Sequence, residues 1–338
     1  AETEMEVKIA GTGSYVPEKL LTNEELERMV DTSDSWIRER TGIGSRRISS
    51  SGTADMAARA AERALADAGL EAGQIELILV GTSTGDCLFP STACQVQEWL
   101  GASGAACFDV SAACSGFLYA LNTAAVYLEA GQFRNALVIG ADAMSKAVDW
   151  TDRSTCILFG DGAGAVVLEA GKKTENPAEC AGKSGSGLGP FVLGADGSRG
   201  SVLRCPSDKD ASVKLTMNGQ EVFRFAVRVI PEVIGQVLEK ASLSAEEIRY
   251  FLLHQANRRI IEAAAKRMKQ PLSRFPMNLE HYGNTSAASI PVLLDELARS
   301  GTLKCGDLLV LAGFGAGLTW GAAVLRWSKE RRELSEIR

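Results

Sequence analysis

The feature that most constrains this chain is an alternation of short apolar runs with longer helical segments. Runs such as VKIAGTG, IELILVGTS and NALVIGADA have the length and the branched side chains of buried strands. ADMAARAAERALADAG and a segment starting near Ser91 have the length of helices. This alternation predicts an α/β fold with largely buried sheets.

The second half of the chain loosely repeats the first. IELILVGTS corresponds to IRYFLLHQA, and each follows similar sequence, LADAGLEAGQ and LEKASLSAEE. Nearly equal distances then lead to Cys114 in the first half and to Asn284 in the second. Several matches in the same order predict a duplicated βαβ unit, with Cys114 and Asn284 each opening a helix after a strand.

A polar, glycine-rich stretch separates the two repeats. This stretch, Gly171–Gly189, has the composition of a connection between structural units. We therefore expect one half over residues 1–175 and a second over 186–327. The remaining residues, 328–338, predict a charged and frayed helical extension.

Composition excludes several classes of function. The net charge of −6 argues against a general nucleic-acid binder, which needs a broad basic surface. Two uncharged stretches, Val110–Leu128 and Leu308–Leu325, contain polar residues or glycines, so we expect no membrane span. The eight cysteines show no CxxC or CxxH spacing, so no metal site is predicted, and a reducing compartment is favoured.

Cys114 is the best candidate for a nucleophile. It lies in DVSAACSGF, between a short strand and a long apolar helix. Backbone N–H groups and the helix dipole at such a turn favour a thiolate, which predicts a lowered thiol pKa. The alternative is a small packed residue without chemistry.

Polar candidates that could assist it are few. Of the two histidines, His254 ends a predicted strand, where α/β sheets place their sites, and His281 lies in a polar turn. His254 alone is equally consistent with a structural, hydrogen-bonded histidine. Asn284 precedes a helix, where an N-cap role is the alternative. The run GFGAGLTWG allows backbone N–H groups to approach a ligand closely, as in an oxyanion hole.

Together these segments resemble a known family. DTSDSWIRERTGI, DVSAACSGF, VDWTDRSTCILFGDGAGAV, MNGQEVFRFAV, LLHQANRRII, YGNTSAASIP and GFGAGLTWG are similar, in order, to segments of β-ketoacyl-acyl-carrier-protein synthase III. The resemblance runs from about Val7 to Trp327. It implies a thiolase-like fold with α-β-α-β-α layers, and a homodimer.

The resemblance also implies a mechanism. Cys114 would take a short acyl group, such as acetyl, from acyl-CoA. Malonyl-acyl carrier protein would then lose carbon dioxide, and neutral His254 and the Asn284 amide would stabilise the enolate. The N–H groups of Cys114 and Ala316 would hold the thioester oxyanion. Related elongating synthases use two histidines, so Asn284 indicates the initiating branch. No cofactor is implied, since acyl-CoA is a substrate.

Substrate and partner contacts follow from the same resemblance. Phe89 would reach across the dimer and close the acyl pocket of the partner subunit. Lys266, Arg267 and Lys269 extend a basic helix that would suit an acidic carrier protein, with a solvated helix face as the alternative. The implied CoA contacts are Trp36, Arg40, Arg153, Gly219, Asn257 and Arg259, and the implied carrier-protein contacts are Gln255, Ala256, Asn257, Arg258 and Arg259.

Other functions remain open at this point. A relative that makes a quinolone or polyketide starter would share the fold and the three polar residues. A cysteine hydrolase would also use Cys–His–Asn, but the chain lacks a CGSCW-like segment. A non-catalytic binding subunit would have no reason to keep all three. We expect a cytoplasmic protein, with the plastid stroma as the alternative.

Overall fold

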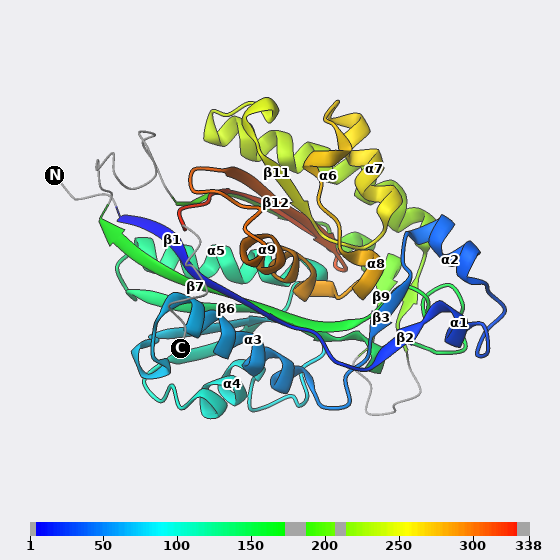
Figure 1. Ribbon diagram of the computed structural model, residues 1–338, viewed down its shortest axis with the longest axis horizontal. Helices are drawn as coiled ribbons and strands as arrows, with labels where there is room; N and C mark the ends of the chain where they lie inside the picture. The colour runs from blue at the N-terminus through cyan, green and yellow to red at the C-terminus, as the bar shows by residue number, and fades with distance from the viewer. Residues whose placement is uncertain (1–4, 173–186, 207–213, 330–338) are drawn as a thin grey trace.

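The computed structural model describes residues 5–172, 187–206 and 214–329. These residues form two mixed β-sheets separated by a layer of central helices, with further helices outside each sheet (Figure 1). The layers therefore run α-β-α-β-α, which confirms the predicted fold class.

The first sheet has the order β1-β7-β6-β4-β5. Its central strand pairs are parallel, because β4 (Leu77–Gly81) lies between β5 (Ala106–Val110) and β6 (Asn135–Ala143). The long strand β7 (Asp161–Lys172) pairs antiparallel with β6, and β1 (Met5–Tyr15) pairs antiparallel with β7. This leaves β5 as an edge strand.

The second sheet repeats this plan in the order β11-β12-β13-β8. β11 (Tyr250–Leu253) is parallel to β12 (Leu308–Gly315). β13 (Thr319–Arg326) and β8 (Leu188–Ala195) are then antiparallel. Strand for strand, they match β4, β6, β7 and β1, so the predicted duplication is confirmed. Among the described residues no strand of this sheet corresponds to β5.

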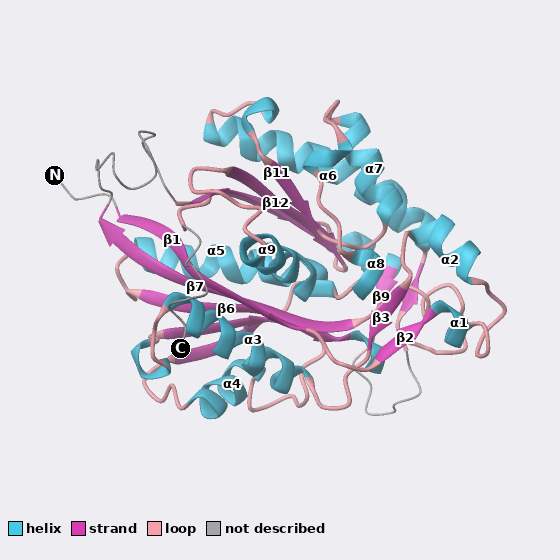
Figure 2. Cartoon of the chain, in the orientation of Figure 1, coloured by secondary structure: helices cyan, strands magenta, loops and turns pink. Residues whose placement is uncertain are grey.

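Helices cover both faces of each sheet (Figure 2). The helices that form the layers are α3 (Thr53–Ala68) and α4 (Thr92–Leu100) outside the first sheet, α6 (Gly219–Ala241) and α7 (Arg258–Arg267) outside the second, and α5 (Gly116–Glu129) and α9 (Ser289–Arg299) between them. The shorter elements are β2 (Leu20–Thr22), α1 (Asn23–Leu26), α2 (Asp34–Thr41), β3 (Ser45–Arg47), β9 (Leu203–Arg204), β10 (Thr216–Met217) and α8 (Leu279–Tyr282).

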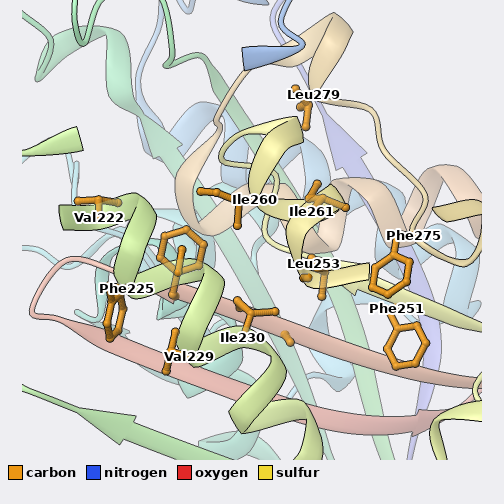
Figure 3. Packing of buried hydrophobic residues seen from close by; sticks show 14 of the residues in the cluster. Val222, Phe225, Val229, Ile230, Phe251, Leu253, Ile260, Ile261, Phe275 and Leu279 are labelled. Carbon is orange, nitrogen blue, oxygen red and sulfur yellow. The ribbon is translucent and has the colours of Figure 1, made fainter. Parts of the chain in front are cut away.

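Burial of apolar faces explains this arrangement. The helix α6 turns Phe225, Val229 and Ile230 toward the second sheet, and Ile260 of α7 packs beside them (Figure 3). In the first sheet, Gly13 lets α3 lie directly on β1, because a Cβ there would be 2.4 Å from the Ala60 carbonyl oxygen. Both sheets are thus buried on two faces, as their nearly continuous apolar strands require.

Two segments predicted from the sequence, the connection between the halves and the C-terminal extension, lie partly outside the described residues. Of the connection Gly171–Gly189, the first residues continue β7 and the last begin β8, while residues 173–186 lie outside the described residues. Most of the extension 328–338 also lies outside them, and the limits of the two halves stay predictions. Within the described ranges, no helix is long and apolar enough to span a membrane.

Candidate active site

Cys114 lies at the tight turn that the sequence predicted. A short 3-10 turn, Ala113–Ser115, joins β5 to α5, and Ala113 adopts a left-handed conformation with φ of 47°. A strained strand-to-helix turn of this kind exposes the next side chain at the sheet edge, like a nucleophile elbow. Cys114 is 8% exposed and lines a cavity.

The protonation state of Cys114 differs from the prediction. Burial raises the pKa of the Cys114 thiol to about 12. The helix N-terminus favours a thiolate, but the loss of hydration in the closed site, which is not visible in the sequence, has the larger effect on the pKa of Cys114. The resting group is therefore a thiol, and the predicted lowering of its pKa is wrong.

Ser286 is the side chain that contacts the sulfur. Its hydroxyl lies 3.4 Å from Cys114 Sγ and donates to it. Ser286 is 2% exposed and has a φ of 54°, in the turn that begins α9. This hydrogen bond lowers the thiol pKa, against the larger effect of burial. The sequence analysis did not single out Ser286, although it lies in the GNTSA motif.

His254 follows β11 directly and is 2% exposed. Its Nδ1 lies 2.7 Å from Ser289 Oγ, and its ring packs against the edge of Phe314. Burial lowers the pKa of His254 to about 3, so the imidazole is neutral, as the sequence analysis expected. Because Nδ1 faces Ser289, Nε2 is the ring nitrogen left for the cavity.

Asn284 is held by its backbone and by its side-chain oxygen. Its N–H donates to the Leu158 carbonyl, and its own carbonyl accepts from Gly160 N–H, at 2.8 and 3.0 Å. The Ser286 N–H donates to Asn284 Oδ1 at 2.9 Å. With the oxygen occupied, the side-chain NH₂ group is the part available to the cavity. Asn284 Oδ1 therefore supports the turn that leads into α9, while its NH₂ group remains for the cavity.

The predicted oxyanion turn packs tightly against Cys114. A Cβ added to Gly315 would lie 2.8 Å from the Cys114 backbone nitrogen, so only glycine allows this approach. Thr319 links the glycine turn to the Cys114 turn, because its hydroxyl lies 3.1 Å from both the Ala112 and the Ala316 carbonyl oxygens. Gly315, the residue before Ala316, therefore lies directly against Cys114, and the supporting role of Thr319 was not predicted from the sequence.

A single cavity of about 200 Å³ joins most of the predicted site residues. It brings together the three proposed catalytic side chains, four of the expected CoA contacts and an apolar wall. The lining includes Cys114, His254, Asn284, Arg40, Gly219, Asn257, Arg259, Leu203, Met217, Phe159 and Phe314. The cysteine and four of the expected CoA contacts therefore line one and the same cavity.

The expected adenine clamp lies near the cavity residue Arg40. The Arg153 guanidinium lies 4.5 Å from the Trp36 ring centroid, and that of Arg40 lies 5.7 Å from the same ring. Asp31 pairs with Arg153 at 3.7 Å. An incoming base would therefore have to displace Arg153 from the ring before it could stack there.

The segment predicted to contact a carrier protein, residues 255–259, contains both buried and exposed side chains. Arg258 and Arg259 begin α7 and are exposed, and Asn257 caps the helix. Gln255 is instead 1% exposed, and its amide donates to the Leu253 carbonyl at 2.8 Å. The prediction that Gln255 contacts a carrier protein is wrong, because its side chain holds the loop from inside. Farther along, Lys266, Arg267 and Lys269 are exposed as expected.

Phe89 does not line the cavity of its own chain. It is 84% exposed, beside Leu88 at 89%. Asp86 anchors this loop, since its carboxylate accepts from the N–H groups of Thr53 and Ala54 and pairs with Lys146. A large apolar side chain held in solvent by an anchored loop is typical of an interface.

A buried arginine that was not predicted from the sequence supports the segment hydrogen-bonded to Asn284. Arg46 is fully buried, and its guanidinium donates to the Ile157 carbonyl at 2.8 Å and to Asn23 Oδ1 at 2.8 Å. Burial lowers its pKa to about 10. The neighbouring Leu158 receives the Asn284 N–H. Nothing in a single sequence distinguishes such an arginine from an exposed one.

Comparison with known proteins identifies the family. Residues 108–197 and 238–327 match the two models that describe 3-oxoacyl-(acyl-carrier-protein) synthase III and its C-terminal part. The β-ketoacyl-(acyl-carrier-protein) synthase III of Geobacillus kaustophilus is 51% identical over 323 residues, covering 95% of this chain and 99% of that protein. The chain belongs to the synthase III family.

Solved structures agree with this assignment. The family member from Aquifex aeolicus is 46% identical, with a TM-score of 0.88 over 95% of this chain and 100% of that one. The priming β-ketosynthase of a polyketide pathway is 35% identical, with a TM-score of 0.88 over 98% of this chain and 99% of that one. The fold is thus shared across the family, and identity is higher to the 3-oxoacyl synthase.

Within the described part of the chain, no cluster of three or more His, Cys, Asp or Glu side chains could hold a metal ion.

Proposed function

We propose that this chain is an initiating condensing enzyme, which joins a short acyl group from acyl-CoA to malonyl-acyl carrier protein. The observation that carries the proposal is the cavity that combines the Cys114 thiol with two donors, from His254 and Asn284. Membership of the synthase III family supports the same reaction. The enzyme is then a decarboxylating acyltransferase of fatty acid synthesis.

The first step transfers the acyl group to Cys114. The sulfur attacks the thioester carbonyl, the new Cys–S–acyl bond forms as the bond to the CoA sulfur breaks, and the thiol proton ends on the CoA sulfur. The N–H groups of Cys114 and Ala316 stabilise the oxyanion of the tetrahedral intermediate. Burial of the thiol makes this step depend on proton removal.

The second step is the condensation. Malonyl-acyl carrier protein loses carbon dioxide, and the negative charge passes to its thioester oxygen as an enolate. His254 Nε2–H and the Asn284 NH₂ group stabilise that oxygen. The carbanion attacks the acyl-cysteine, which releases 3-oxoacyl-acyl carrier protein and, after uptake of a proton, the Cys114 thiol. All chemistry is carried by side chains and two thioesters, so the proposal includes no cofactor.

Charge and exposed apolar surface support the partners. The basic residues at the start and end of α7 suit an acidic carrier protein. The edge strand β5 and the exposed Leu88 and Phe89 suit a homodimer that pairs its edge strands. In that dimer Phe89 would close the partner's acyl pocket. We place the enzyme in the cytoplasm, with the plastid stroma as the alternative.

A reconstitution tests the proposal against its rivals. The chain is incubated with acetyl-CoA, malonyl-acyl carrier protein and, separately, medium-chain acyl-CoA. We expect 3-oxobutanoyl-acyl carrier protein and stoichiometric carbon dioxide. Hydrolysis of acetyl-CoA alone would support a hydrolase, failure to form an acyl-enzyme would support a binding subunit, and strong preference for the medium-chain primer would support a specialised starter synthase.

A further inference from the structure

Ser289 contacts the catalytic histidine from behind. It lies in the first turn of α9 and is 2% exposed, and its Oγ is 2.7 Å from His254 Nδ1. Both side chains are shielded from solvent, so their polar atoms depend on each other for hydrogen bonding. The direction of this one hydrogen bond decides which ring nitrogen of His254 carries the proton.

The donors around Ser289 fix that direction. The Gln255 backbone N–H donates to Ser289 Oγ at 3.3 Å, which uses one acceptor site of the hydroxyl. Among the described residues, Nδ1 is the single acceptor in reach of the hydroxyl proton. If Nδ1 donated to Ser289 Oγ instead, the Ser289 hydroxyl proton would be buried without an acceptor, which is unfavourable. Nδ1 therefore accepts.

We infer that Ser289 is a positioning residue that holds His254 in the tautomer with its proton on Nε2. The ring then presents a donor to the cavity and acts as a hydrogen-bond donor to the enolate rather than as a base. This catalytic meaning rests on the proposed function. Asn284 is arranged in the same way, since Ser286 N–H occupies its oxygen and leaves its NH₂ group for the cavity.

The duplicated fold shows that the contact is a specific feature of the second half. In the first half, the strand β4 and the helix α5 meet through Gly81 and Gly116, where a Cβ on Gly81 would lie 2.4 Å from the Gly116 carbonyl carbon. His254 and Ser289 have the same sequence separation as these glycines: His254 directly follows the matching strand β11, and Ser289 begins the matching helix α9. The second half replaces a backbone contact between glycines with a hydrogen-bonded pair.

Nuclear magnetic resonance can observe the tautomer directly. The chain has two histidines, so ¹⁵N-histidine labelling of a His281→Gln variant leaves a single labelled ring. Protonated and unprotonated nitrogens of neutral imidazole have well-separated ¹⁵N shifts. We expect Nε2 to be the protonated nitrogen in this background and this preference to weaken or reverse in Ser289→Ala. A proton on Nδ1 with Ser289 present would overturn the inference, whatever the activity.

Kinetics then test the consequence for the reaction. We expect Ser289→Ala to lower the rate of condensation on the order of tenfold, the scale of one lost buried hydrogen bond, and to leave acyl transfer to Cys114 within about twofold. Ser289→Thr, which keeps the hydroxyl, should recover part of the condensation rate. Ser300→Ala is the matched control, because its hydroxyl bonds the Leu297 carbonyl at the far end of α9.

Two outcomes separate this inference from the proposed function. If the tautomer changes in Ser289→Ala while acyl transfer and condensation fall equally, the role assigned to Ser289 in condensation is wrong. If the protein with Ser289 shows Nε2–H yet forms no condensation product, the proposed function fails and the assignment of the tautomer stands. Thermal unfolding of each variant checks that loss of rate does not reflect loss of fold.

Discussion

The two halves of the molecule contain the same kind of backbone turn before their central helices, but the two turns have different hydrogen-bond partners. Each has a 3-10 turn that enters a central helix, and each turn begins with a left-handed residue, Ala113 with φ of 47° and Ser286 with φ of 54°. The next residue is Cys114 in the first half and Ala287 in the second, so the predicted equivalence of Cys114 with Asn284 is wrong. Asp142 Oδ2 accepts the Ala287 N–H at 3.2 Å, so that turn is closed by the protein itself.

The difference teaches how a duplicated fold becomes an asymmetric site. The Cys114 turn packs against the glycine turn at Gly315, and its N–H is the oxyanion donor of the proposed mechanism, whereas the Ala287 N–H is bonded to Asp142. The second half instead contributes side chains: Ser286 to the sulfur, and Asn284 and His254 as donors. Nucleophile and donors thus come from opposite halves, across the central helix layer.

The largest effect should come from the nucleophile itself. Cys114→Ser should lower activity on the order of 10³-fold or more, because an alkoxide is much harder to generate than a thiolate. Mass spectrometry after acetyl-CoA treatment should find the acetyl group on the Cys114 peptide. Cys156→Ser is the control, since Cys156 is buried but lies outside both turns. Acetyl on Cys156 or Cys87 would contradict the assignment.

The donors from the second half should affect a single step. His254→Ala and Asn284→Ala should each slow condensation by about 10²- to 10³-fold, the usual cost of one lost oxyanion donor. Acyl transfer should be largely retained, because its oxyanion is held by backbone N–H groups. Rapid-quench measurement of the acyl-enzyme separates the two steps. An equal loss of both steps would mean that the halves do not divide the reaction in this way.

The thiol provides a pH test of the first half. With a pKa of about 12, the thiolate fraction of Cys114 rises tenfold per pH unit through neutral pH. Alkylation of the free enzyme by iodoacetamide should therefore keep accelerating from pH 6 to about pH 10. Ser286→Ala removes a hydrogen bond that lowers this pKa, so it should slow alkylation further at each pH. A plateau near neutral pH would restore the original prediction of a thiolate.

Sequence patterns predicted the fold because its determinants are local. Strand and helix periodicity, repeated at similar spacing, were enough for the duplicated layers, and the motif around Cys114 located the turn. The burial of individual polar side chains could not be predicted from these sequence patterns. Burial raises the pKa of Cys114, whereas a lowered pKa was predicted. Gln255 was predicted at the surface, but its side chain is buried and hydrogen-bonded inside the protein.

The supporting residues escaped for a related reason. Ser286, Ser289, Thr319 and Arg46 act through partners far away in sequence, such as the contact of Ser286 with Cys114. A serine or threonine is ordinary in any polar segment, and its role depends on which chain segment the fold brings beside it. The three proposed catalytic residues could be selected from motifs, whereas the residues that contact and orient them are recognisable only in the folded structure.

The loops that follow β4 and β11 extend the comparison between the halves. The β11 loop, with Ala256 and Asn257, lines the cavity of its own chain. The corresponding β4 loop carries Phe89 into solvent at 84% exposure. If the dimer proposal holds, this loop completes a pocket in the other subunit, and Phe89 limits the length of the primer there.

The smallest predicted effect is a shift in primer length. Phe89→Thr removes a ring whose volume a longer acyl chain could occupy, and each buried methylene contributes about 0.8 kcal/mol, or roughly fourfold in binding. The homodimeric variant should therefore favour acyl-CoA primers several carbons longer than acetyl, mainly through lower KM. The wild-type chain, assayed with the same series, is the reference.

A heterodimer then tests whether the loop acts on its own chain or on its partner. One subunit carries Cys114→Ala and the other Phe89→Thr, so the single working cysteine lies in the Phe89→Thr chain. If the loop closes the partner's pocket, that cysteine faces the wild-type Phe89 of the other subunit, and the primer range stays short. If the loop closes its own pocket, the heterodimer accepts long primers as the Phe89→Thr homodimer does. Two differently tagged subunits, purified in sequence and assayed with acetyl-CoA and octanoyl-CoA, distinguish these outcomes, because they predict opposite preferences from the same active site.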